Sequence, residues 1–130
     1  MADYKERLNR LSGQILDASI TVHKEMGPGL LESVYEKCLM EEFRLRNIFA
    51  ENQVELPLIY KGKELEKEFR IDILVEREII IEIKSTESML PVFKAQIISY
   101  LKLADKRLGF LINFNVPLLK DGFFRFVNNF

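Results

Sequence analysis

Residues 69–84 have the sequence FRIDILVEREIIIEIK, and this segment decides the fold. Strand side chains alternate between the two faces of a sheet, so β-branched residues recurring at every second position indicate strands. The pattern predicts one strand over about residues 65–76 and another over about 79–85. The acidic and basic run between them, Glu76-Arg77-Glu78, is predicted to be the hairpin loop.

The register of this hairpin follows from which side chains must be buried. In both strands the odd-numbered residues form the more apolar face, and both such faces should contact the core. A slip of one residue would turn one of these faces toward solvent. Pairing of Val75 with Ile79, across a three-residue loop, satisfies the condition, whereas a two-residue loop at Arg77-Glu78 does not.

This register places Asp72 opposite Glu82, with their Cβ atoms about 4.5–5.5 Å apart. Lys84 follows two residues later on the same face. Opposed carboxylates repel, and a hard divalent cation between them would remove that cost, because Mg²⁺ and Mn²⁺ prefer oxygen ligands. Lys84 would then hold a water molecule or stabilise developing negative charge. The alternative is that Lys84 only neutralises the two acids on a solvated face.

Length and composition favour a globular chain. The 130 residues fit one domain, residues 1–130, which can bury about two thirds of its unfolded surface. The single cysteine, Cys38, excludes an internal disulfide and a zinc site built on cysteine pairs. We expect no signal peptide and no membrane span, because no apolar run approaches roughly 18 residues. A cytoplasmic location is the expectation.

The net charge of −1 argues against a strong stand-alone nucleic-acid binder, since phosphate contacts usually need a basic excess. Local basic patches remain as candidate contacts. They comprise Lys61, Lys63, Lys67 and Arg70 in one group, and Lys102, Lys106 and Arg107 in another.

The remaining elements follow from periodicity and from glycine and proline positions. Gly27-Pro28-Gly29 separates two helices, and Pro91 suits the first turn of a third. The order α-α-β-β-β-α-β-β predicts an α/β protein with a mixed sheet flanked by helices. The predicted helices span about 8–25, 30–46 and 91–105, and the other strands about 51–60, 107–114 and 123–127, with a turn at 61–63.

Two segments carry a family resemblance. Residues 29–35, GLLESVY, contain the motif that names the GxxExxY protein family, and residues 111–122, LINFNVPLLKDG, also resemble that family. The resemblance extends from His23 to Asn128. The family in turn resembles the PD-(D/E)xK nuclease superfamily, which implies a restriction-endonuclease-like core of mixed sheet and flanking helices.

The resemblance implies roles for the hairpin residues. It implies that Asp72 and Glu82, with the backbone carbonyl of Ile83, bind Mg²⁺ or Mn²⁺. Lys84 would orient the attacking water. Ile71 stands where the superfamily usually has proline, a substitution common among its members.

Two helical positions are further candidates. Gln96 and Tyr100, in QIISY, resemble the Q-x-x-x-Y motif of RecB-like exonucleases, which implies that Gln96 acts in the site and that Tyr100 lines it. The alternative is a buried polar pair that ties the helix to the sheet. Glu32 is implied as another metal-facing acid, although an acid in a first helical turn is also favoured by the helix dipole.

Three other residues are expected to be structural. Tyr35 lies in the apolar stripe of its helix, the lone His23 is more often structural than catalytic in such a chain, and Cys38 suits buried packing.

These observations predict a divalent-metal-dependent nuclease that hydrolyses phosphodiester bonds in DNA or RNA. The alternative is a non-catalytic nucleic-acid or protein-interaction module that retains the fold. A third interpretation is a homodimer, in which the phenylalanines near the C-terminus form the interface or, equally, part of the core. These are Phe123, Phe124, Phe126 and Phe130.

Overall fold

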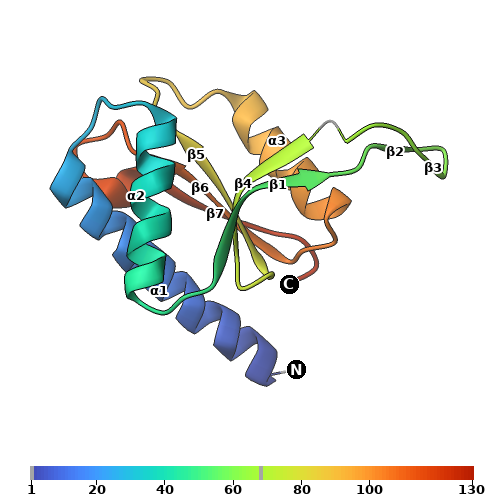
Figure 1. Ribbon diagram of the computed structural model, residues 1–130, viewed down its shortest axis with the longest axis horizontal. Coiled ribbons are helices and arrows are strands. Elements are labelled where there is room, and N and C mark those ends of the chain that lie inside the picture. The colour runs from blue at the N-terminus through green and yellow to red at the C-terminus, as the bar shows by residue number, and fades with distance from the viewer. Residues whose placement is uncertain (1, 68) are drawn as a thin grey trace.

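The computed structural model describes residues 2–67 and 69–130, and its centre is a five-stranded mixed sheet of order β1-β4-β5-β6-β7 (Figure 1). Helices α1 and α2 cover one face and α3 covers part of the other. The predicted fold class is therefore confirmed. The elements are α1 Ala2–Met26, α2 Glu32–Leu45, β1 Ala50–Leu56, β2 Ile59–Tyr60, β3 Lys63–Glu64, β4 Phe69–Val75, β5 Ile79–Lys84, α3 Pro91–Leu103, β6 Leu108–Asn113, the 3₁₀ helix η1 Leu119–Gly122 and β7 Phe123–Val127.

The β4–β5 hairpin has the predicted register. Val75 pairs with Ile79, and Ile73 pairs with Ile81. The loop is tight: Glu76 and Arg77 have φ values of 51° and 57°, and the Glu78 N–H donates to the Val75 carbonyl at 2.9 Å. β5 then pairs with β6 in parallel, which requires the crossover that α3 provides.

The larger of the two apolar cores lies between the sheet and the helices α1 and α2. Residues at helical spacing along α1, including Leu8, Ile15 and Val22, pack there with Leu39 and Phe43 of α2. The sheet contributes fully buried side chains of β4, β5 and β6, among them Ile73, Ile79, Ile81, Leu108 and Ile112.

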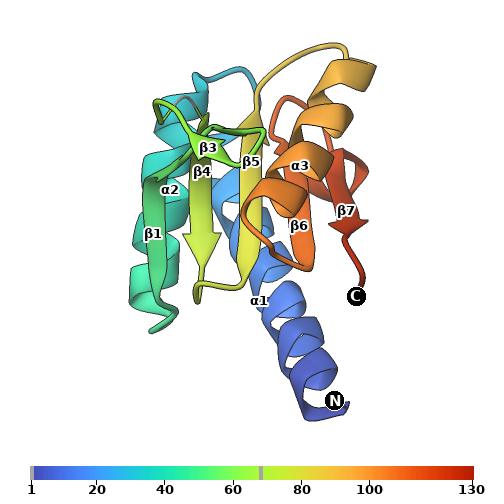
Figure 2. The same ribbon diagram turned by 90° about the vertical axis from the view of Figure 1, so that its right-hand side faces the viewer.

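A smaller core lies on the opposite face, beneath α3. Ile97 and Leu101 of the helix pack with Ile80 and Leu111 of the sheet. α3 packs mainly against β5, β6 and β7. Figure 2 shows that, among the described residues, no helix lies in front of β1 and β4 on this face. The candidate site lies on β4 and β5, beside this part of the sheet.

The predicted strands over 51–60 and 65–76 were wrong in extent. Pro57 has no N–H and interrupts the first, so β1 ends at Leu56. Residues 59–64 instead form a separate two-stranded hairpin, β2–β3, which projects on the α3 side of the sheet (Figures 1 and 2). Tyr60 is 60% exposed there and contributes nothing to a buried face. Glu68, within the second predicted strand, lies outside the described residues.

The predicted common face of β4 was also wrong in part. Ile73 and Val75 pack in the larger core, whereas Phe69 and Ile71 pack in the smaller one. Pairing changes between these two pairs of residues, because the ladder with β5 includes Ile73 but residues 69–71 pair only with β1. The strand thus contacts different layers along its length.

The corner between α1 and α2 explains two positions of the GxxExxY pattern. Gly29 has φ of 92°, which favours glycine. The Tyr35 hydroxyl donates to the Gly27 carbonyl at 2.5 Å and accepts from the Leu30 N–H at 3.1 Å, and its ring stacks on Phe114 with centroids 4.4 Å apart. Tyr35 is fully buried, as predicted.

The other residues expected to be structural differ in burial. His23 is buried, and its Nε2 lies 2.8 Å from the Val116 carbonyl oxygen, a structural contact between α1 and the segment after β6. Cys38 packs against the larger core but is only half-buried, so the expectation of buried packing is met only in part. It lies on the side of α2 that faces a surface groove toward α1.

The C-terminal phenylalanines are divided between the two faces of the sheet. Phe123 stacks on Phe110 in the larger core, while Phe124 and Phe126 pack against the smaller one. Phe130 packs at the edge of the larger core. They therefore do not form one exposed patch. Among the described residues, none of the α-helices is long and apolar enough to cross a membrane.

Candidate active site

Two carboxyl groups replace part of the hydrogen bonding between β4 and β5. Beyond Ile73 and Ile81, Asp72 Oδ2 accepts the Ile83 N–H at 2.8 Å, and Glu82 Oε2 accepts the Asp72 N–H at 2.9 Å. The two acids are thus joined to each other's strands. The predicted convergence of Asp72 and Glu82 is present in the structure.

The second oxygen of each carboxyl group is available. No hydrogen bond reaches Asp72 Oδ1 or Glu82 Oε1 from residues 2–67 or 69–130. In the same residues every buried side-chain oxygen has a hydrogen-bond partner, so these two oxygens must reach solvent. Each acid therefore has one oxygen that holds the sheet and one that is free to bind a ligand.

Burial makes this pair costly to ionise. Glu82 is 4% exposed, and its pKa is raised first by burial and then by the charge of Asp72. Burial also raises the pKa of Asp72, while the hydrogen bond from Ile83 opposes the rise. A bound cation would relieve both desolvation and repulsion, because it favours the ionised carboxylates.

Lys84 lies at the end of β5, one pleat beyond Glu82. Its Nζ lies 4.4 Å from the centroid of the Phe93 ring on α3. The backbone here is fixed, because the Lys84 carbonyl accepts the Phe114 N–H at 3.0 Å and the Ser85 hydroxyl donates to the Leu30 carbonyl at 2.6 Å. Lys84 lowers the pKa of both acids, which places its charge near them.

Gln96 and Tyr100 face the same region from α3. Gln96 Nε2 donates to the Tyr100 hydroxyl at 3.1 Å. Burial and the charge of Glu82 raise the pKa of Tyr100, so its hydroxyl stays protonated beside the acids. Gln96 lines a hollow together with Lys84, whereas Tyr100 is mostly buried. Both the polar pair and the proximity to the acids are therefore present.

The helical acid expected at the site has a neighbour that sequence reasoning missed. Glu32 is exposed at the start of α2 and is a weak influence that raises the pKa of Asp72. Glu36, one turn later on the same helical face, raises the pKa of Asp72 more strongly and raises that of Glu82 as well. Glu36 could have been found from its spacing of four residues from Glu32, which places both acids on one face of the helix.

Glu36 is held in place by β1. Asn52 Nδ2 and Gln53 Nε2 donate to its two carboxylate oxygens at 3.1 and 2.8 Å. Gln53 has φ of 53°, unusual within a strand, and it lies opposite the position of Asp72 in the β1–β4 register. This arrangement brings a third carboxylate toward the pair from the opposite helical layer.

The donor set suits a hard cation but is incomplete from side chains alone. Within the described residues, no group of three or more His, Cys, Asp and Glu side chains is placed to hold a metal ion. Asp72 and Glu82 offer one oxygen each, and Ile83 follows Glu82 with a backbone carbonyl. Mg²⁺ is commonly bound by one or two carboxylates and keeps several of its waters, so these oxygen ligands are of the right type and number to hold it.

A family model described as the PD-(D/E)XK nuclease superfamily matches residues 9–126. Comparison with curated proteins gave no match, and comparison with solved structures gave none either. The matched region contains the whole sheet except the last residue of β7, together with both acids and Lys84. Members of this superfamily generally use divalent metals and act on nucleic acids. The chain belongs to the PD-(D/E)XK nuclease superfamily.

Proposed function

We propose that this protein is a Mg²⁺- or Mn²⁺-dependent nuclease that hydrolyses phosphodiester bonds. The observation that carries the proposal is the pair of half-buried Asp72 and buried Glu82 on adjacent strands, with one oxygen of each open to solvent. Burial raises the pKa of both acids even though Lys84 lies near them, and acids perturbed in this way are concentrated at functional sites.

Asp72, Glu82 and the Ile83 carbonyl are the proposed ligands, and Glu36 rather than Glu32 is the stronger candidate for a further acid. When bound, a divalent cation supplies Lewis acidity that activates water and offsets the phosphate charge. Lys84 donates hydrogen bonds to the attacking water and to a phosphate oxygen. Gln96, held by Tyr100, positions the phosphate group from the α3 side.

The reaction is a hydrolysis. The water oxygen forms a bond to phosphorus, and the bridging phosphorus–oxygen bond breaks. The attacking water releases a proton to solvent, and the departing alkoxide takes one up. Lys84 stabilises the negative charge that grows on the phosphate during this step.

Three finer statements belong to the same proposal. The motif at residues 29–35 supports membership of the GxxExxY protein family, because the structure gives Gly29 and Tyr35 specific roles in the α1–α2 corner. We further infer that residues 1–130 act as one domain and that the protein is cytoplasmic. A homodimer stays a prediction, but the C-terminal phenylalanines pack against the two cores, which is the alternative to their forming its interface.

A non-catalytic module is the second candidate, and one observation favours it. Each acid also serves the sheet as a hydrogen-bond acceptor, so both would persist without catalysis. Calorimetric titration of Mn²⁺ into wild type and Asp72→Asn separates the two candidates, followed by cleavage assays on DNA and RNA. Asparagine keeps an acceptor for the Ile83 N–H, so this variant should fold.

The nuclease proposal expects Mn²⁺ binding and cleavage by wild type, with both lost in Asp72→Asn. Binding without cleavage of any substrate would favour the module. Absence of Mn²⁺ binding by a folded wild type would contradict the metal site itself.

A further inference from the structure

Two adjoining hollows lie along α3 beside the candidate site. The first, of about 490 Å³, begins at Lys84 and continues past Gln96 and Ser99. The second, of about 540 Å³, continues from Gln96 and Ser99 to Lys102. The two hollows adjoin at Gln96 and Ser99, which line both, and together we call them the α3 groove.

The charged residues that line the α3 groove are both lysines. Lysines stand near its two ends, and no aspartate or glutamate lines either hollow. The helix itself, Pro91–Leu103, contains two lysines and no acid. Within the described part of the chain, neither Lys84 nor Lys102 forms an ion pair. Such a groove suits a ligand with repeated negative charges.

Aromatic rings lie between the two lysines. Phe93 lines the first hollow and Phe69 lines the second, and both rings are half-buried. Tyr100 meets Phe69 edge to face, with ring centroids 5.9 Å apart. Unpaired bases stack on such rings for about 1–3 kcal/mol each, whereas the bases of a duplex are already stacked on one another. The combination therefore favours a single strand over a duplex.

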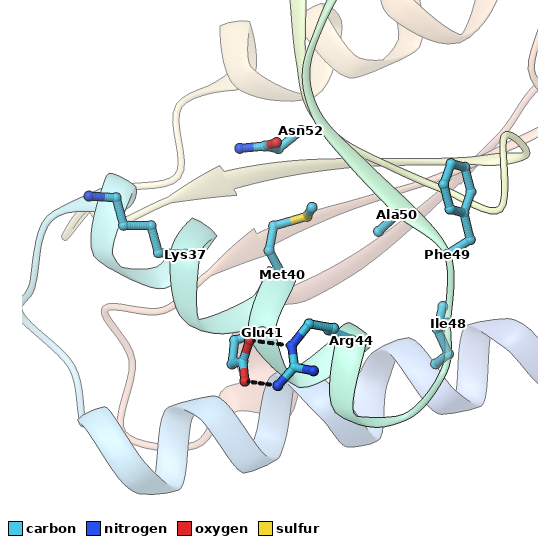
Figure 3. A pocket seen from close by; sticks show the side chains of 8 residues that line it. All are labelled: Lys37, Met40, Glu41, Arg44, Ile48, Phe49, Ala50 and Asn52. Atoms are coloured by element: carbon cyan, nitrogen blue, oxygen red, sulfur yellow. Dashed lines mark hydrogen bonds and ion pairs between the residues drawn. The ribbon is translucent and has the colours of Figure 1, made fainter.

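A hollow on the other side of the sheet provides a comparison. It has a volume of about 450 Å³ and lies between α2 and β1 (Figure 3). Its lining mixes both signs of charge and includes an ion pair, because Arg44 makes two hydrogen bonds to Glu41 at 2.8 and 2.6 Å. Lys37 lines the same hollow as Glu41, whereas no acid lines the α3 groove. Hollows of similar size thus differ in charge, and only the α3 groove matches a polyanion.

We propose that the α3 groove binds a single-stranded polynucleotide, with one phosphate at Lys84, another at Lys102 and bases against the rings between them. This inference rests on the proposed function, since it assigns the substrate class of the same site. The strand enters at the end of the groove lined by Phe69 and Lys102 and runs along α3 to Lys84, beside the acids.

The test is fluorescence anisotropy with labelled oligo(dT), oligo(rU) and a duplex, each of about 12 nucleotides or base pairs. Ca²⁺ replaces the catalytic ion so that binding is measured without cleavage. We expect a single strand to bind at least about tenfold more tightly than the duplex. Lys102→Ala should weaken strand binding about fivefold and reduce the salt slope by about 0.7. The dT and rU probes distinguish DNA from RNA.

Matched variants control for charge and folding. Lys37→Ala removes an equally exposed helical lysine from the opposite side and should leave strand binding unchanged. Ser99→Glu places a negative charge where the two hollows join and should abolish binding, whereas Gln14→Glu makes a similar change on exposed α1 and should not.

The outcomes separate this inference from the nuclease proposal. Equal losses in Lys102→Ala and Lys37→Ala, tighter binding of duplex, or displacement of the strand by polyglutamate as readily as by oligo(dT) would overturn the groove assignment. If wild type still cleaved nucleic acid with Mn²⁺, the nuclease proposal would survive that result. Conversely, the expected binding pattern without any cleavage would support the groove and contradict the nuclease.

Discussion

The two faces of the five-stranded sheet differ in how fully the helices cover them. Against α1 and α2, the sheet buries isoleucines and aromatic residues in one extended core. Against α3, the smaller core reaches β1 and β4 through Leu56, Ile71 and Leu74, but within the described residues no helix covers these two strands. The hydrogen-bonded acids Asp72 and Glu82 lie beside this part of the sheet. We therefore expect most of the stability to come from the α1/α2 face and the chemistry to depend on the α3 face. Substitutions on each face should separate the two properties.

The largest effect is expected in the larger core. Phe43 is fully buried there, and Phe43→Ala should lower the free energy of unfolding by about 3–5 kcal/mol through lost burial and a cavity. Phe93→Ala, which removes a half-buried ring on α3, should cost clearly less. Urea denaturation followed by circular dichroism measures both. Equal costs would contradict the assignment of stability to the α1/α2 face.

The next largest effect is a loss of cleavage activity with little change in stability. Lys84→Ala should reduce the cleavage rate about 10²–10³-fold, because a charge that stabilises the transition state is lost. Its stability should change by less than about 1 kcal/mol, since only a cation–π contact disappears.

Lys94→Ala is the matched control for Lys84→Ala. Lys94 Nζ also lies over a phenylalanine ring, 5.1 Å from the Phe124 centroid, but it lines neither hollow of the α3 groove. Its cleavage rate should stay within about twofold of wild type. A metal-dependent Lys84→Ala enzyme with full activity would exclude the proposed mechanism.

The third effect is a dependence of stability on pH in the absence of metal. The pKa of Glu82 is raised from 4.5 to about 8 in the folded state. Between these two pH values the folded protein therefore holds a proton that the unfolded chain has lost. Stability from this group is therefore complete below the lower value and is lost as pH rises through the upper one. Glu82→Gln should remove this loss, on the order of 2 kcal/mol.

Thermal unfolding in a chelator, at about pH 5 and about pH 9, measures that difference. Wild type should lose more Tm than Glu82→Gln across this range, and Mn²⁺ should restore wild type at the higher pH. Parallel pH profiles for the two proteins would show that the pair is not a strained feature of the α3 face.

The smallest effect distinguishes two acids on α2. Glu36→Gln should weaken Mn²⁺ binding about fivefold, near 1 kcal/mol, because Asn52 and Gln53 hold its carboxylate toward the acid pair. Glu32→Gln should change the affinity by less, since Glu32 is exposed. Calorimetric titration measures the Mn²⁺ affinity of both variants. A larger loss of affinity in Glu32→Gln than in Glu36→Gln would make Glu32 the additional acid of the site.

The central hairpin was predictable from sequence because its constraint is local. The alternation of isoleucines, together with the need to bury both apolar faces, leaves one register, and that register brings Asp72 to Glu82. The β2–β3 hairpin was not predicted, although Pro57 was a signal against one continuous strand. The position of Glu36 near the acids depends on hydrogen bonds from Asn52 and Gln53 of β1. The periodicity of one helix gives no information about such contacts.

The face of Phe69 and Ile71 was missed for a different reason. Strict alternation assumes a regular pleat along the whole strand, and here Asp72 is missing from both ladders while Gln53 opposite it has φ of 53°. β4 instead pairs with β1 alone at its start and with both β1 and β5 further on, and its side chains change core between these parts. The residue between them, Asp72, lies where the two pairings meet.

The hydrogen bonds from the Asp72 and Ile83 amides to the two carboxyl groups have a consequence for measurement. Most amides of a sheet are protected from deuterium exchange by carbonyl groups, which do not titrate. These two are protected by acids whose charge responds to pH and to a bound cation. Their exchange rates would therefore report the occupancy and protonation of the site directly, residue by residue, without a label or a substrate.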